Sequence, residues 1–154
     1  MRTNSVERFW EEFCALEPSV SSDTPHQTWY FGNTRDMATE LADLVLSGRK
    51  TATASLLAMN ELNPSDAPQP DGYSVITDFD GIPLCVLQTT EIRHLRFDEV
   101  DERFAADEGE GDLSYDYWRR VHWDYFSREA AINGFEFDGS SVVCCERFRV
   151  LYPR

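Results

Sequence analysis

The sequence predicts an α+β domain in which a small, mostly antiparallel β-barrel carries helices on its flank. Its 154 residues have the length of one domain, so residues 1–154 are taken as a single unit. Stretches with helical spacing of apolar residues and stretches with a period of two follow one another in the order helix, helix, strand, strand, strand, helix, helix, strand. Two consecutive strands are joined by a hairpin signal, which favours antiparallel pairing.

Two helices are predicted in the N-terminal third. The first covers about residues 5–17 and ends near Pro18, because apolar residues recur at helical spacing: Val6, Phe9, Trp10, Phe13 and Leu16. Residues 18–33 are expected to form a loop that ends in the aromatic run from Trp29 to Phe31. The second helix covers residues 34–47, since Thr34 is a good N-cap and Gly48 stands where a glycine commonly ends a helix.

A strand is expected over residues 50–57. Thr51, Thr53 and Ser55 alternate with apolar residues, and this period of two places the three hydroxyls on one face. Lys50 is expected in the turn between the second helix and this strand, where its long side chain can fold back toward Thr53. The segment therefore predicts a cation at the mouth of a strand, beside a row of hydroxyls.

The rest of the chain completes the barrel and its helical flank. Residues 63–72 have turn composition, and strands over 73–77 and 83–92 are joined across Asp80-Gly81. An acidic helix starts near Asp98 and leads into the glycine-punctuated segment 107–112. The next helix is expected to carry Trp118 and His122 beside its main apolar stripe, and residues 141–152 form the last strand; the stripe consists of Leu113, Tyr117, Val121 and Tyr125.

Charge excludes one large class of partner. The chain has 28 acidic and 14 basic residues, a formal net charge of −14, and half of it lies in residues 98–112, where eight acids face only Arg103. Such a run is usually a solvated surface. Tight binding of long duplex nucleic acid needs a basic surface, so any contact with RNA should be local. The expected partner is a nucleoside or a short single strand of RNA.

Cysteine spacing and hydropathy point to a cytoplasmic protein. Cys14, Cys85, Cys144 and Cys145 show no CxxC spacing, which favours reduced thiols without a metal site. The sequence shows neither a secretory signal nor a run of 18 apolar residues, so no membrane partner is expected. The oligomeric state leaves no signal in the sequence.

Lys50 is the only lysine among the 14 basic residues. Arginine keeps its charge permanently, whereas a lysine amine can be made neutral by burial. A single lysine in an otherwise arginine-only chain suggests a need for a proton-exchanging amine, or for a compact ammonium, at this position.

Several short motifs resemble the ASCH domains, a family with a PUA-like β-barrel. Gly48-x-Lys50-x-x-Thr53 matches most of the G-x-K-x-x-T-x-R signature, and residues 50–55 resemble the longer bacterial branch of the family. Further similar blocks lie at residues 31–34, 88–90, 97–100, 108–112 and 118–122. The resemblance covers an ASCH core of about residues 28–152, and the first helix resembles an addition to it.

The resemblance implies that the chain handles RNA or nucleosides. Some relatives resemble N4-acetylcytidine amidohydrolases with a Lys/Thr/Glu trio, and others are ribonucleases or RNA-binding modules. By position the catalytic trio would be Lys50, Thr53 and Glu108, while Ser55 replaces the arginine of the signature and leaves a more neutral floor.

The trio suggests a chemistry for amide hydrolysis. Thr53 would be the nucleophile, which needs a base beside it. Lys50 can be that base only if its pKa is lowered, and an ionised Glu108 would raise it. Glu108 is therefore better suited to hydrogen bonding with the nucleobase or ribose, or to passing a proton to the leaving amine.

Other residues are candidates for contact with substrate or metal. Arg49, Thr51 and Ser55 flank the trio, and Trp29, Trp118 and His122 could stack on or contact a base, although packing in the core is the usual role of such residues. No cofactor is expected. Glu110 and Asp112, with Glu108, alternate with glycines and are weak candidates for a transient Mg²⁺.

Three functions remain open on the sequence. The first is hydrolysis of an acylated cytidine-like nucleoside, which suits an acidic surface because a neutral nucleoside needs no basic groove. The second is a ribonuclease that uses Lys50 to neutralise a phosphate, assisted by Mg²⁺. The third is a non-catalytic module that binds a modified base or nucleotide.

Overall fold

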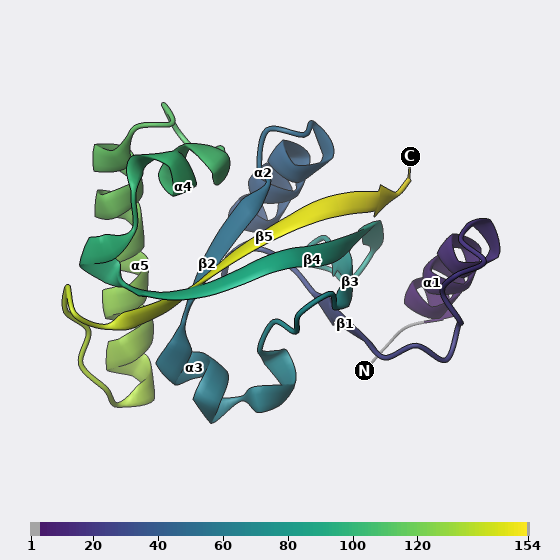
Figure 1. The fold of residues 1–154 in the computed structure, drawn as a ribbon, viewed down its shortest axis with the longest axis horizontal. Helices are drawn as coiled ribbons and strands as arrows, with labels where there is room; N and C mark the ends of the chain where they lie inside the picture. The colour runs from purple at the N-terminus through teal and green to yellow at the C-terminus, as the bar shows by residue number, and fades with distance from the viewer. Residues whose placement is uncertain (1–3, 154) are drawn as a thin grey trace.

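The computed structural model describes residues 4–153. Its helices and strands follow one another as α1 (Asn4–Leu16), β1 (His26–Trp29), α2 (Arg35–Leu46), β2 (Ala52–Leu56), α3 (Leu57–Leu62), β3 (Tyr73–Thr77), β4 (Pro83–Arg96), α4 (Glu102–Asp107), α5 (Tyr115–Asn133) and β5 (Val142–Tyr152) (Figure 1). Two short 3₁₀ turns, η1 (Pro64–Asp66) and η2 (Phe97–Glu99), follow α3 and β4. The predicted α+β class is confirmed.

The five strands form one curved sheet in the order β1-β3-β4-β5-β2. Only β1 and β3 are parallel, and the other three neighbouring pairs are antiparallel. The sheet does not close into a complete barrel, because β1 and β2 are edge strands. Instead of pairing, they line opposite walls of a cavity of about 810 Å³, with Trp29 on one side and Ser55 on the other.

Two elements were not predicted. β1 lies inside the expected loop 18–33; it has only four residues, and its order depends on pairing with β3, which leaves no local pattern in the sequence. The helix α3 takes Leu57, which was assigned to the end of a strand. The hairpin between β3 and β4 forms as expected, with the amide of Gly81 donating to the carbonyl of Asp78 at 3.1 Å.

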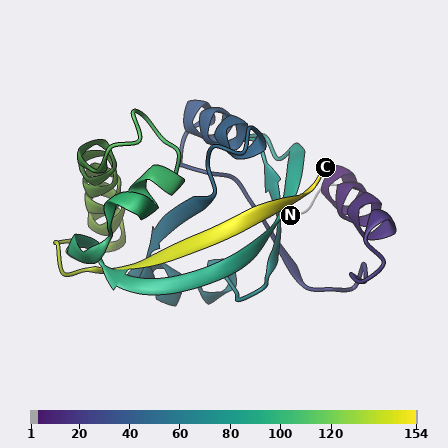
Figure 2. The same ribbon diagram turned by 45° about the horizontal axis from the view of Figure 1, so that its top comes forward.

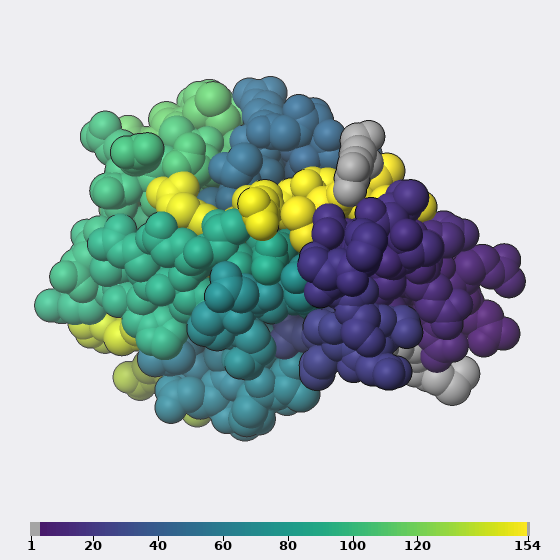
Figure 3. Space-filling model, turned by 45° about the vertical axis from the view of Figure 1, so that its right-hand side comes forward, coloured from purple at the N-terminus to yellow at the C-terminus, as the bar shows by residue number. Residues whose placement is uncertain are grey.

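Helices cover both faces of the sheet (Figure 2). We call the face that packs against α2 the inner face; its apolar centre consists of Ile76, Leu87 and Phe148, in contact with Val45 of α2. α1 packs on the opposite face through Trp10 and its neighbours, against Val75 and Val86. The space-filling view shows α1 covering one end of the molecule, with β5 exposed as a narrow strip (Figure 3).

The long helix α5 packs on β2 and β5 with a different stripe from the one predicted. Trp118, His122, Phe126 and Ala130 are the buried residues of α5, while Leu113, before the helix, is exposed and Tyr117, Val121 and Tyr125 are half-buried. Both sets have helical spacing, so the sequence pattern alone could not select between them. The aromatic cluster around Phe97 decides the choice, because Trp118 stacks on it at 5.3 Å.

The chemistry of the cysteines agrees with the prediction, since all four are free thiols. Within residues 4–153, no helix combines the length and apolar character needed to cross a membrane.

Candidate functional site

The turn after α2 directs Lys50 into the protein interior. Gly48 adopts φ +82°, and the amides of Arg49 and Lys50 both donate to the carbonyl of Leu44 at 3.0 Å. β2 begins at Ala52, so Lys50 lies in the helix-to-strand turn as predicted. The residue is only 2% exposed, which is unusual for a lysine.

The Lys50 ammonium has a complete set of acceptors. Its Nζ donates to the Ala52 carbonyl at 2.9 Å, to Glu108 Oε1 at 3.1 Å, to the Glu108 carbonyl at 3.3 Å and to Glu110 Oε2 at 2.9 Å. It also lies 5.6 Å from the centre of the Phe31 ring, within reach of a cation–π interaction. These contacts stabilise a charged amine rather than a neutral one.

A glycine brings the acidic loop onto this turn. Gly109 has φ +72°, and a Cβ atom there would lie 2.4 Å from the carbonyl oxygen of Arg49. The amide of Thr51 also donates to the carbonyl of Asp107 at 2.8 Å. The segment between α4 and α5 is thereby packed directly against the Lys50 turn. Part of the acidic run is therefore buried, although an acidic run of this kind is usually solvated.

Glu108 is held from two sides. Its Oε1 accepts from Lys50, while its Oε2 accepts the indole N–H of Trp118 and lies 3.3 Å from His122 Nε2. The His122 ring stacks on Trp118 at 4.4 Å, and its Nδ1 lies 2.8 Å from the Trp118 carbonyl oxygen. Both nitrogens of the imidazole thus face acceptors, which favours the imidazolium.

The protonation of this cluster follows from burial and charge. Burial opposes the ammonium of Lys50, but Glu108 and Glu110 outweigh it and raise the pKa of Lys50. For His122, burial likewise opposes the charge, and Glu108 outweighs it, so that the pKa of His122 is also raised. The neutral, proton-accepting Lys50 considered from the sequence is therefore wrong for this arrangement.

The two glutamates differ. Burial opposes ionisation of Glu108, but His122 and Lys50 outweigh it and lower its pKa. Burial raises the pKa of Glu110, and the Glu108 charge adds to this, while Lys50 only partly offsets it. The side chain of Glu110 is also the most exposed member of the cluster, at 15% against 1% for Lys50 and Glu108. Glu110 therefore covers Lys50 on the side nearest to solvent.

Thr53 is not part of this network. It lies on the inner face of β2 and is half-buried. Its hydroxyl hydrogen-bonds to no residue in the described part of the chain and is not sealed from solvent. The structure thus brings Lys50 and Glu108 together and leaves the Thr53 hydroxyl free on the strand that follows Lys50. Its role as a nucleophile stays a prediction.

The other candidate residues lie in three places: the cavity between the edge strands, the core and the surface. Trp29 and Ser55 line the cavity between the edge strands, and Ser55 also accepts from Asn60 at 3.1 Å. Arg49 and Thr51 are exposed. Trp118 is 2% exposed and has rings on its faces, so a base-stacking role is wrong for it in this conformation; it binds Glu108 instead. His122 is buried beneath Trp118 rather than placed at a rim.

The metal candidates are only partly brought together. Within residues 4–153, Glu108, Glu110 and His122 offer ligand atoms within 4.8 Å of one another, whereas exposed Asp112 instead accepts from the amide of Ser114. The Lys50 ammonium already bridges the two carboxylates. A cation at this place would have to compete with that ammonium for both carboxylates.

Sequence reasoning missed Glu146. This residue of β5 is 6% exposed, lies opposite Thr53 in the β2–β5 pairing, and accepts from the Thr89 hydroxyl at 2.5 Å. Burial raises its pKa, against the opposing effects of Thr89 and Lys50. The available signal was an acidic residue within the apolar alternation of the last strand.

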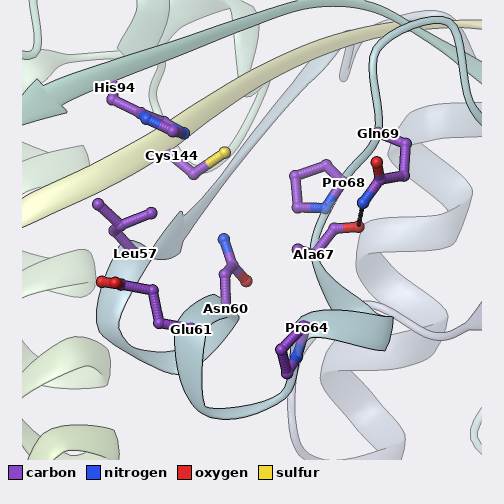
Figure 4. A pocket seen from close by; sticks show the side chains of 9 residues that line it. All are labelled: Leu57, Asn60, Glu61, Pro64, Ala67, Pro68, Gln69, His94 and Cys144. Carbon is purple, nitrogen blue, oxygen red and sulfur yellow. Dashed lines mark hydrogen bonds between the residues drawn. The ribbon is translucent and has the colours of Figure 1, made fainter.

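A second cavity opens on the same face, beneath α3 and η1 (Figure 4). It measures about 500 Å³, and His94 and Cys144 from neighbouring strands form its floor. Asn60 and Gln69 supply amide groups from the covering segment. Apolar walls and neutral amides make up most of the lining, and Glu61 adds one carboxylate.

An open, mostly antiparallel sheet with a lysine at the mouth of an edge strand defines a PUA-like α+β domain. The chain belongs to the ASCH domain family, whose family model matches residues 27–152. An ASCH domain from Lactobacillus crispatus has a similar structure, with a TM-score of 0.88 and 33% identity, over 98% of this chain and 96% of that one. A protein from Enterococcus faecalis is similar with a TM-score of 0.84 and 33% identity, over 95% and 87% of the two chains. None of the curated proteins matches the chain.

Proposed function

We propose that this ASCH domain hydrolyses the amide of an N4-acylated cytidine or a similar small, neutral nucleoside derivative. The observation that carries the proposal is the buried cluster of Lys50, Glu108, Glu110 and His122 beside the free hydroxyl of Thr53. Burying several charged groups costs free energy that apolar side chains would not, and such clusters occur preferentially at functional sites. The acidic surface supports a neutral substrate over a polyanion.

In the proposed mechanism Lys50 acts through its charge. The acyl carbonyl oxygen takes the place of the Glu110 carboxylate beside Lys50 Nζ, on the side of the cluster nearest to solvent. The ammonium then neutralises the oxyanion of the tetrahedral intermediate. Glu108 holds Lys50 in place, since both of its oxygens are already engaged.

Thr53 supplies the nucleophile. Its Oγ1 attacks the acyl carbon, and its proton passes to a carboxylate acting as the base. The C–N bond breaks as that proton moves to the departing N4 amine, leaving cytidine and an acyl ester on Thr53. Water, activated by the same carboxylate, cleaves the ester to the carboxylic acid and restores the hydroxyl.

The test is turnover of N4-acetylcytidine to cytidine, followed by absorbance. We expect Thr53→Val to lower kcat by at least about 100-fold, since it removes the nucleophile without changing the shape of the side chain. Lys50→Met, which removes the charge, should lower kcat by about 100- to 1000-fold. Thr90→Val is the matched control, because Thr90 is an exposed threonine of β4, and it should retain activity within about twofold.

Absence of turnover by the wild-type chain would overturn the hydrolase proposal. Cleavage of short single-stranded RNA that requires Mg²⁺ and fades with salt would then favour the ribonuclease. Saturable binding of cytidine that survives Thr53→Val, without turnover of any substrate, would favour the binding module. If Lys50→Met does not fold, Thr53→Val still decides the question.

A further inference from the structure

We infer that Glu146 is the general base that takes the proton of Thr53 and returns it to the leaving amine. The inference rests on the proposed hydrolase function and assigns the one catalytic role that the Lys50 cluster leaves open. Lys50 is held as an ammonium, and the two oxygens of Glu108 are occupied by Lys50, Trp118 and His122. Neither is able to receive a proton without breaking these contacts.

Register places Glu146 beside Thr53. The two residues are direct partners in the antiparallel β2–β5 pair, so their side chains project from the same face with Cβ atoms about 4.5–5.5 Å apart. Oε2 of Glu146 accepts from the Thr89 hydroxyl at 2.5 Å. Oε1 has no hydrogen-bond partner among residues 4–153 and is not sealed from solvent. The Thr53 hydroxyl is free in the same way, so two unpaired oxygen atoms lie on the same face of neighbouring strands.

Three cavities of the inner face are lined by neighbours of Glu146 or Thr53. Thr89, the hydrogen-bond partner of Glu146, lines a cavity of about 330 Å³. Cys144, two residues earlier on the same face of β5, lines the cavity of Figure 4. Ser55, two residues after Thr53 on β2, lines the cavity between the edge strands.

The surroundings make the Glu146 carboxylate a stronger base than an exposed glutamate. Burial raises the pKa of Glu146, while the Thr89 hydrogen bond and the Lys50 charge act against this. Other titratable groups on this face are Cys144, whose pKa burial raises to about 11, Cys85, whose pKa burial also raises, and His94 on β4. A carboxylate with a raised pKa is a stronger base toward the Thr53 hydroxyl.

The proposed proton path is balanced. Glu146 takes the Thr53 proton as the C–O bond forms, and the resulting carboxylic acid gives that proton to N4 as the C–N bond breaks. In the second half-reaction Glu146 takes a proton from water, and the water oxygen attacks the ester carbon. The proton then goes to Thr53 Oγ1 as the ester bond breaks.

The experiment is the pH dependence of kcat for N4-acetylcytidine. The wild-type rate should rise through a limb centred above the ordinary glutamate pKa of about 4.3. Glu146→Gln should lower kcat by about 100- to 10,000-fold, abolish the limb, and leave the affinity for cytidine within a few-fold. Thr89→Val removes a hydrogen bond to the carboxylate, so it should raise the pKa of Glu146 and move the limb to higher pH.

Glu91→Gln is the control, because Glu91 is an exposed glutamate on β4. An active wild type whose Glu146→Gln variant keeps both its rate and its limb would overturn the assignment of Glu146 while leaving the hydrolase function in place. A wild type without turnover would instead overturn the function itself. If Glu146→Gln does not fold, an unmoved limb in Thr89→Val would overturn the inference.

Discussion

Lys50 shows how burial can preserve a charge instead of removing it. An isolated ammonium in a low-dielectric interior loses its proton, yet four acceptors surround Lys50 Nζ. Two of these acceptors belong to carboxylates, so the ion pair repays part of the desolvation cost. The same argument applies to His122, whose imidazolium faces Glu108. Each charge in the cluster is stable only because the others are present.

The stability of the fold should therefore depend on pH through His122. Its folded-state pKa is raised, so the stabilisation is complete below the unfolded value of about 6.5 and is lost as the pH rises through the folded value. We expect the free energy of unfolding, measured with urea, to fall as the pH rises above the unfolded value of about 6.5. His122→Gln should flatten this dependence.

His94→Gln is the comparison for that measurement, since His94 is an exposed histidine of β4. It should preserve the wild-type dependence on pH. A wild-type stability that stays constant from pH 6 to pH 9 would contradict a charged His122.

Among the elements, the loop between α4 and α5 has the largest effect on the site. It delivers Glu108 and Glu110 to Lys50, although 58 residues separate Lys50 from Glu108 in the sequence. The loop can pack this closely against the Lys50 turn because residue 109 is a glycine. A side chain at that position would clash with the carbonyl oxygen of Arg49. The acidic residues reach the interior only as a result of this close packing.

Gly109→Ala should accordingly be strongly destabilising. The new methyl group would clash with backbone atoms and hold a left-handed conformation, for which we expect a loss of roughly 2–6 kcal/mol in urea unfolding. Gly134→Ala has a similar φ of +80° with no atom within 4 Å, and should lose only about 1–2 kcal/mol. Equal losses for the two variants would show that the close approach at Gly109 does not matter.

At the scale of the whole molecule, the net charge and the lining of the cavities both favour an uncharged ligand. The surface carries a large excess of acids, while the clefts of the inner face are lined mainly by apolar and neutral polar side chains. Such a molecule repels a polyanion but can admit an uncharged nucleoside. The α1 helix, which lies outside the family match, packs on the opposite face of the sheet from the clefts.

Salt should have little effect on nucleoside binding. Cytidine carries no charge, so its dissociation constant should change by less than about twofold between about 50 and 200 mM salt. A short oligocytidine should bind no more tightly than cytidine, because the large excess of acidic residues repels its phosphates. Isothermal titration calorimetry checks both. Affinity that grows with length and falls steeply with salt would contradict this picture and favour an RNA-binding groove.

Local signals in the sequence were sufficient for several features. Thr34 and Gly48 mark the ends of α2, the alternation of Thr53 and Ser55 with apolar residues marks β2, and Asp80-Gly81 marks the hairpin. Each depends on backbone preferences of neighbouring residues, which the chain carries wherever it folds. The position of Lys50 in its turn follows from the same signals, and the family resemblance pointed to its partnership with Glu108.

Only the tertiary structure decided the chemistry. β1 forms because β3 lies beside it, and α5 turns its Trp118 stripe inward because Phe97 is there. The charge of Lys50 and the burial of Glu146 depend on groups brought from distant segments, and electrostatic energies change steeply with distance and burial. The sequence by itself therefore determined the elements and the fold class, while the packing of those elements decided which side chain can hold a proton and which must keep its charge.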